Sequence, residues 1–126
     1  MLLIKRNLTI TRKTIIIGGT QIHFDYEIDD SIIEISGMLV ITLEIPANVN
    51  YSQNVFGISL FEKKIKWQIE KRVIPFSGNQ NFPCMSIFLD ENRAVRAEYW
   101  GNTYFILDPF TGQILSEGLI LSLIHI

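Results

Sequence analysis

Hydrophobic and polar residues alternate along most of this chain, in short runs separated by turn residues. The alternation is clearest over residues 64–70, where apolar side chains occupy every second position. A period of two is typical of a half-buried β-strand, so we expect Ile65, Trp67 and Ile69 to share its buried face. Because a shift of one residue would expose Trp67, the register of this strand should be firmly specified.

Residues 38–45 form a second alternating run. Its two predicted faces carry Leu39, Ile41, Leu43 and Ile45 on one side and Val40, Thr42 and Glu44 on the other. Proline cannot donate a hydrogen bond to a central ladder, so Pro46 should end the strand. The run therefore predicts one long strand with a mostly apolar composition.

Turn signals divide the chain into hairpins. Gly18-Gly19 suits a two-residue hairpin turn with positive φ angles, and residues 108–112 (DPFTG) suit a turn with glycine in the left-handed position. Residues 54–70 and 96–115 share the order strand, turn, strand, although residues 93–100 would also tolerate a short helix. We expect an all-β single domain over residues 1–120. It should contain about nine or ten short antiparallel strands in meander order, as a roll, partly open barrel or small sandwich.

Two resemblances support this fold class. The turn at residues 108–112 and the strand pair at residues 55–69 resemble quinoprotein-type β-propeller repeats. The whole pattern is also similar to a group of small bacterial all-β proteins with a Trp-Gln-Ile-Glu strand and an Asp-Pro-x-Thr-Gly turn. A closed propeller of four or more blades does not fit this length. The resemblances imply an all-β fold and no cofactor, because nothing matches a quinone-binding site.

Composition and charge narrow the class of protein. Of 126 residues, 48% are hydrophobic and 19% are charged, which is a globular composition. The formal net charge of -2 argues against a general nucleic-acid binder, which needs an excess of Lys and Arg. Cys84 is the sole cysteine, so no intrachain disulfide is expected. With no signal peptide or membrane span predicted, we expect a cytoplasmic protein without a membrane partner.

The last six residues, 121–126 (LSLIHI), resemble the translation of an adapter used in sequencing libraries. We therefore predict that they are a non-native tail. The alternative is an apolar edge strand.

An acidic strip is the first candidate for a site. Asp25, Glu27 and Asp29 alternate with apolar residues and would share one face of an extended strand, beside His23. Such a strip would bind a cation or a basic partner. The alternative, which we favour, is the solvent face of an edge strand, where charges block aggregation. Calcium loops need a glycine, and none lies within this run.

No catalytic, cofactor-binding or metal-ligating residue is predicted. His23 has no recognisable nucleophile beside it, and Cys84 lies in an apolar strand that suits a core residue. Aromatic side chains flank the turn at Gly101: Tyr99, Trp100 and Tyr104. They would suit a partner interface, or alternatively would pack over the end of the sheet.

These observations predict a non-enzymatic bacterial protein-interaction domain of the toxin-neutralising immunity type. Its partner would be a basic, toxin-like protein. The candidate interaction surface comprises Asp25, Glu27, Asp29, Tyr99, Trp100 and Tyr104. The alternatives are a small-ligand-binding or enzymatic β domain that uses the loop at residues 71–83, and a fragment of a longer β-repeat protein.

Overall fold

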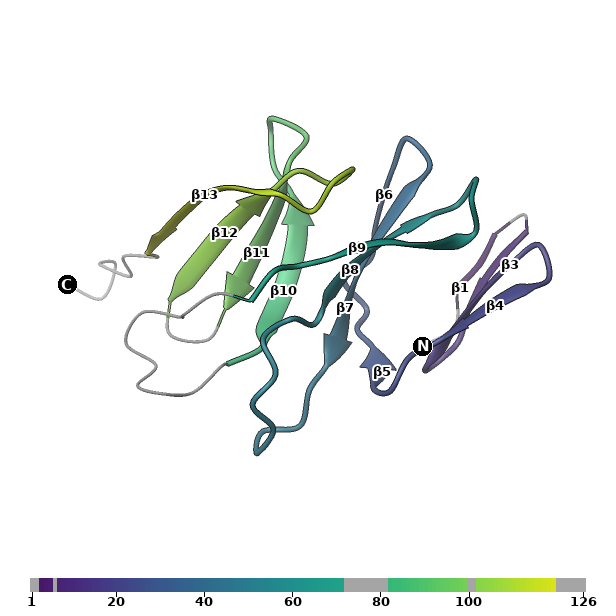
Figure 1. Ribbon diagram of the computed structural model, residues 1–126, viewed down its shortest axis with the longest axis horizontal. Helices are drawn as coiled ribbons and strands as arrows, with labels where there is room; N and C mark the ends of the chain where they lie inside the picture. Colours follow the sequence, from purple (N-terminus) through teal and green to yellow (C-terminus); the bar gives the residue numbers. More distant parts are fainter. Residues whose placement is uncertain (1–2, 6, 72–81, 100–101, 120–126) are drawn as a thin grey trace.

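The computed structural model describes residues 3–5, 7–71, 82–99 and 102–119. These residues form three antiparallel sheets and contain no helix (Figure 1). Accordingly, no helix that could cross a membrane occurs among them. The all-β prediction is confirmed. Residues 121–126, which were predicted to be a non-native tail, lie outside the described ranges.

The first sheet contains four strands in chain order, β1 (Leu3–Lys5), β2 (Leu8–Ile10), β3 (Thr14–Ile17) and β4 (Thr20–His23). Gly18 and Gly19 connect β3 to β4 with φ angles of 52° and 94°. These positive angles confirm the hairpin turn that the sequence predicts, because glycine adopts them without a steric penalty.

The central sheet contains five strands, β5 (Glu27–Ile28), β6 (Ile33–Ile35), β7 (Met38–Glu44), β8 (Val55–Ser59) and β9 (Lys64–Gln68). The short strands β5 and β6 both pair with β7, at opposite ends of it. The remaining order β7-β8-β9 is a meander, as predicted. The pairing of β5 with β7 departs from a simple meander and places residues 27 and 28 beside the end of β7.

The third sheet contains β10 (Cys84–Leu89), β11 (Val95–Tyr99), β12 (Thr103–Leu107) and β13 (Ile114–Leu119), again in chain order. The turn between β12 and β13 closes with a 2.8 Å hydrogen bond from Gly112 N to Asp108 O. Gly112 has a φ of 74°, as the turn prediction requires. A strand and a short helix were both compatible with residues 93–100, and residues 95–99 of this segment form the strand β11.

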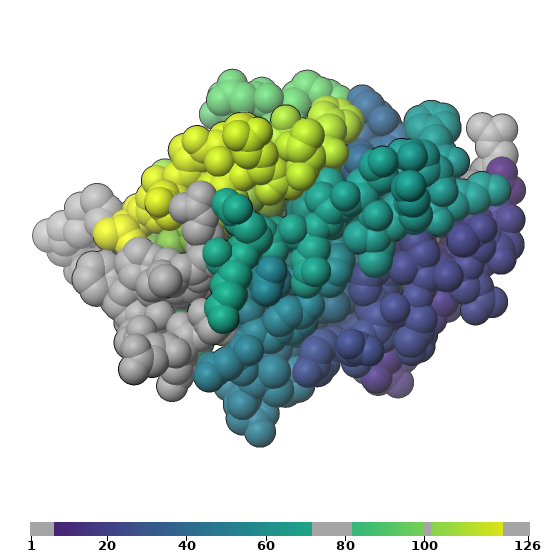
Figure 2. Space-filling model, viewed as in Figure 1, coloured from purple at the N-terminus to yellow at the C-terminus, as the bar shows by residue number. Residues whose placement is uncertain are grey.

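The sheets stack in three layers, with β7 and β8 in the middle (Figure 1). Leu39, Ile41 and Leu43 pack in a first core against the first sheet. Met38 and Val40 point to the opposite face and pack in a second core against the third sheet. The predicted two faces of this strand are therefore confirmed, but both are buried. Figure 2 shows β9 (teal) crossing the front between the N-terminal layer and β13.

Three details of the prediction need correction. The described residues contain thirteen strands, whereas nine or ten were expected, because β1, β2 and β5 have three residues or fewer and are too short for the sequence pattern to mark as strands. Within the described ranges the sheets are open and stacked, so these strands do not close into a barrel. Ile65 does not share a face with Trp67, because a bulge shifts the register so that Ile65 pairs with Ile58 and Trp67 with Gly57.

Trp67 joins the two hairpins that the sequence pattern singles out. Its Nε1 donates a 2.9 Å hydrogen bond to the carbonyl oxygen of Pro109. A Cβ atom on Gly57 would lie 2.1 Å from Trp67 Nε1, and one on Gly112 would lie 2.5 Å from the same ring. Both glycines are therefore needed where the indole packs between β8 and the β12–β13 turn.

Candidate functional site

The predicted acidic strip is not one extended strand. Asp25 and Tyr26 form a bend between β4 and β5, Glu27 lies in β5, and Asp29 follows it. The bend breaks the alternation, so Asp25 lines a different part of the surface from Glu27 and Asp29. The structure thus keeps the three carboxylates near the same end of the central sheet but divides them between separate hollows.

A fourth carboxylate joins them through the register of the central sheet. Glu27 in β5 lies directly opposite Glu44 in β7. Asp29 follows in line with Thr42, to whose carbonyl oxygen its backbone N–H donates a 2.8 Å hydrogen bond. Arg12 forms an ion pair with Glu27. We call Asp25, Glu27, Asp29 and Glu44 the acidic belt.

Sequence reasoning did not include Glu44 in the site. The available signal was a charged residue at the end of an otherwise apolar run. That signal could not reveal the pairing with Glu27, because nine residues that include the whole of β6 separate β5 from β7 in the chain.

The first hollow of the belt has a volume of about 510 Å³. Its lining residues are His23, Phe24, Asp25, Tyr26, Leu43, Val49, Asn50, Tyr51, Phe56 and Ile65. Phe24, Leu43 and Phe56 form a buried apolar floor. The β-bulge that turns Ile65 away from Trp67 places it in this wall. The hollow combines aromatic walls with one carboxylate.

Tyr51 is held in place at this hollow. Its hydroxyl oxygen accepts a 3.0 Å hydrogen bond from Gln68 Nε2, and its ring lies 6.0 Å from that of Tyr26, centroid to centroid. Burial raises the pKa of Tyr51, and the negative charge of Asp25 raises this pKa further. Asp25 and Tyr51 line the same hollow. His23 also lines this hollow, and its Nδ1 lies 3.0 Å from Thr14 Oγ1.

Two further hollows continue the belt. One of about 360 Å³ shares Tyr26 with the first hollow and is also lined by Lys13, Glu27 and Glu44. The other, of about 220 Å³, shares Glu44 and contains Asp29, Thr42 and Cys84. The hollows therefore adjoin one another around the end of β5 and β7.

Cys84 is a poor nucleophile. Burial raises the pKa of its thiol to about 12, and Sγ donates to the carbonyl oxygen of Ser86 at 3.3 Å. A thiol with this pKa stays protonated at neutral pH and does not attack. Within the described residues, no group of three or more His, Cys, Asp or Glu side chains is placed to hold a metal ion.

The aromatic part of the predicted surface does not join the belt. Tyr99 is buried in the second core, and its hydroxyl donates a 2.9 Å hydrogen bond to the carbonyl oxygen of Ser52. Burial raises the pKa of this hydroxyl well above its ordinary value. Including Tyr99 in an exposed surface was therefore wrong, since its alternation with Ala97 and Val95 places it inside. Trp100 lies outside the described residues.

Tyr104 lies on the outer side of the third sheet, half-buried. The guanidinium carbon of Arg96 lies 4.0 Å from the centre of its ring, and Arg96 Nε donates to Glu98 Oε2 at 2.9 Å. These contacts form a cation–π stack on the sheet face. Tyr104 lines none of the hollows of the acidic belt.

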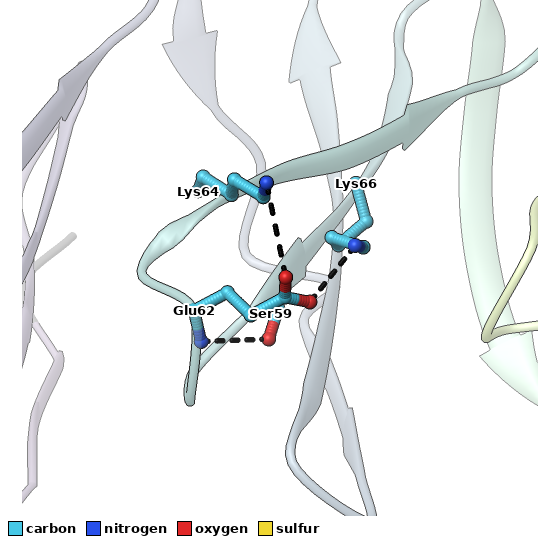
Figure 3. Close-up of polar contacts among 4 residues, drawn as sticks. All are labelled: Ser59, Glu62, Lys64 and Lys66. Atoms are coloured by element: carbon cyan, nitrogen blue, oxygen red, sulfur yellow. Dashed lines mark hydrogen bonds and ion pairs between the residues drawn. The ribbon is translucent and has the colours of Figure 1, made fainter.

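The lysines of the β8–β9 hairpin are paired locally (Figure 3). Lys66 Nζ lies 2.8 Å and Lys64 Nζ 3.7 Å from the carboxylate oxygens of Glu62. Glu62 N also donates to Ser59 Oγ at 3.0 Å, and the hydrogen bond from Lys66 lowers the pKa of Glu62. This strand face is solvated, and both lysines are paired with a carboxylate of the same hairpin. The loop at residues 71–83, another predicted site, lies mostly outside the described residues.

A comparison with models of protein families identifies the family of this chain. Residues 5–119 match the model of a family described as a domain of unknown function, DUF7957. The chain belongs to this family. No curated protein matches the chain. The family match covers all three sheets but assigns no activity to the belt.

Proposed function

We propose that this DUF7957 domain is a non-enzymatic protein-interaction domain that binds a basic protein partner through its acidic belt. The observation that carries the proposal is the placement of Glu27 directly opposite Glu44. Like charges that face each other across an antiparallel pair destabilise it. Arg12 pairs with Glu27 within the chain and offsets part of that repulsion, and Lys or Arg side chains of a partner would offset the rest in the complex.

The surroundings of the belt support the same proposal. The adjoining hollows provide concave surface with aromatic walls, which is typical of the buried centre of protein interfaces. The belt lies in a protein of net charge -2, and complementary charge accelerates association with a basic partner.

As the specific type, we propose a bacterial immunity protein that neutralises a basic toxin in the cytoplasm. Tight coverage of a toxin requires complementary charge and a preformed surface rather than catalysis. A single cysteine, buried as a thiol, is compatible with a reducing compartment.

Any basic protein encoded by a gene next to this one is a candidate partner, and the test is titration calorimetry with that protein after purification. Glu44→Lys should weaken binding by at least about tenfold, because it places a like charge against the partner. Glu91→Lys is the matched control, since Glu91 is exposed in the β10–β11 turn and lines none of the hollows of the belt. It should leave the affinity within about twofold.

The triple reversal of Asp25, Glu27 and Asp29 to Lys should abolish this binding. Raising the salt concentration should slow association of the unsubstituted protein. Unchanged affinity in both Glu44→Lys and the triple variant would contradict the proposal.

A second candidate function is small-ligand binding in the first hollow. Its volume of about 510 Å³ lies in the range of ligand sites, which is roughly 300–1,000 Å³. A ligand found by thermal-shift screening should lose its effect in Phe56→Ala but keep it in Glu44→Lys. The opposite pattern would favour the protein partner.

A further inference from the structure

We propose that the first hollow seats an arginine side chain of the basic partner, with its guanidinium against the rings of Tyr26 and Tyr51 and paired with the Asp25 carboxylate. This inference rests on the proposed function, because it names the partner group that one hollow of the belt receives. It commits to arginine rather than to positive charge in general.

The floor of the hollow is apolar and preformed. Phe24 and Phe56 pack edge to face, with ring centroids 5.2 Å apart, and both are buried. Leu43 completes the floor from the first-core face of β7. Such a floor excludes water beneath an inserted side chain and strengthens its electrostatic contacts. The aliphatic part of a long basic side chain can cover apolar surface of this kind.

The tyrosine wall is fixed in position. Gln68 Nε2 donates both to Tyr51 Oη at 3.0 Å and to the Gln53 carbonyl oxygen at 2.8 Å. This bridge ties the ring of Tyr51 to its own loop and to β9. Tyr26 packs beside it. A wall that is already ordered costs little entropy when a ligand binds.

Asp25 supplies the anion at this hollow. Its side chain is exposed in the bend before β5, and in the described part of the chain no Lys, Arg or His forms an ion pair with it. Asp25 lines this hollow together with Tyr26 and Tyr51. Asp25 is therefore available to a cation from outside, unlike Glu27, which is paired with Arg12.

The combination of groups favours arginine over lysine. A guanidinium is planar, stacks on aromatic rings and forms two parallel hydrogen bonds with one carboxylate. An ammonium is compact and more strongly hydrated, so it gains less from an apolar, aromatic wall. The first hollow offers aromatic surface and a single carboxylate, which fits the guanidinium.

The test is an NMR titration of the whole chain with Nα-acetyl-arginine amide. Saturable shift changes are expected at Asp25, Tyr26 and Tyr51. The neutral isostere Nα-acetyl-citrulline amide should produce none, and Nα-acetyl-lysine amide should bind at least about threefold more weakly.

Two asparagine variants provide the matched comparison. Asp25→Asn should weaken arginine binding by about tenfold, the effect of losing a charged hydrogen-bonded partner. Asp30→Asn makes the same charge change at an exposed residue that lines none of the three hollows, and it should leave binding within about twofold.

The inference would be overturned by no saturable shifts with the arginine probe, by equal shifts with the citrulline probe, or by equal loss in both asparagine variants. Binding of lysine as tight as that of arginine would also overturn it. The proposed function would survive any of these results if Glu44→Lys still weakened binding of the protein partner. Failure of the arginine inference and failure of the proposed function are therefore distinguishable.

Discussion

At the scale of a residue, Asn54 shows how much one polar side chain contributes to the connection between sheets. It is fully buried and immediately precedes β8. Its Nδ2 donates to the carbonyl oxygens of Leu43 and Cys84, both at 2.9 Å. Its Oδ1 accepts from Cys84 N at 2.8 Å. The amide therefore connects the central sheet to the third sheet and satisfies all three backbone groups.

Asn54→Ala should lower the free energy of unfolding by about 2–3 kcal/mol, because it leaves buried backbone groups of Leu43 and Cys84 without partners. Urea unfolding followed by circular dichroism measures this change. Asn92→Ala is the control, since Asn92 is exposed in a turn, and it should stay within about 0.5 kcal/mol of the unsubstituted protein. Equal stability of the two variants would contradict the connecting role of Asn54.

Because of the Cys84 thiol, we expect the folded protein to lose stability in alkali. Its pKa in the folded protein is about 12, against an ordinary value of 9.0. Because the folded-state pKa is raised, the protonated thiol contributes fully below pH 9, and this contribution is lost between pH 9 and pH 12. From pH 8 to pH 10, the unsubstituted protein should lose about 1.4 kcal/mol more than Cys84→Ala.

This comparison isolates the thiol, because both proteins retain the Tyr99 hydroxyl, whose pKa is also raised by burial. Urea unfolding at the two pH values measures it. If the free energy of unfolding falls equally in the two proteins, the Cys84 thiol does not contribute to the loss of stability.

At the scale of an element, β7 determines the architecture. Six of its seven residues are buried, since first-core and second-core residues alternate along it. Its amino-acid pattern predicted a strand and its two faces. It did not predict that both faces would be covered, because the covering strands come from the two ends of the chain.

Met38→Ala and Leu39→Ala test this double burial at neighbouring positions. Met38 belongs to the second core and Leu39 to the first. Each substitution should cost about 2–5 kcal/mol, the range for removing a large buried side chain. Thermal unfolding by calorimetry measures both. A cost near zero for either one would mean that its face of β7 is open to solvent.

The β9 strand shows the limit of pattern reasoning at this scale. The alternation correctly predicted Trp67 and Ile69 as buried, but Ile65 is 40% exposed and lines the first hollow. The bulge that separates Ile65 from Trp67 depends on the pairing of β9 with β8. A single strand read alone carries no information about such a bulge.

At the scale of the whole molecule, two cores share one central sheet. The first core takes residues from β2 and β3, and the second takes residues from β10, β11 and β12. Because β7 and β8 belong to both, loosening one core removes support from the other. We therefore expect one cooperative unfolding transition rather than two.

Ile10→Ala tests this coupling across the molecule. Ile10 is fully buried in the first core, so its loss should cost about 2–5 kcal/mol. The fluorescence of Trp67, which lies in the second core, should report the same shift of midpoint as circular dichroism. A Trp100→Phe background leaves Trp67 as the single tryptophan.

Thr9→Ala is the control for this experiment, because Thr9 is on the same strand but points away from the core. It should change stability by less than about 0.5 kcal/mol. If the unfolding midpoint reported by Trp67 fluorescence does not change in Ile10→Ala, the two cores unfold independently.

The sequence by itself determined the fold class, the longer strands and the turns at Gly18-Gly19 and Gly112. These features depend on local backbone preferences and on a two-residue period, both of which are written in neighbouring residues. It also indicated three of the four belt carboxylates, although as a single strip.

Only the tertiary structure decided the stacking of three sheets, the burial of Tyr99, and the meeting of Glu27 with Glu44. Each of these depends on which distant strands lie side by side and in what register, and such pairings are set by packing over the whole chain. Local alternation shows that a residue faces one side of a strand. What lies on that side is decided by the rest of the molecule.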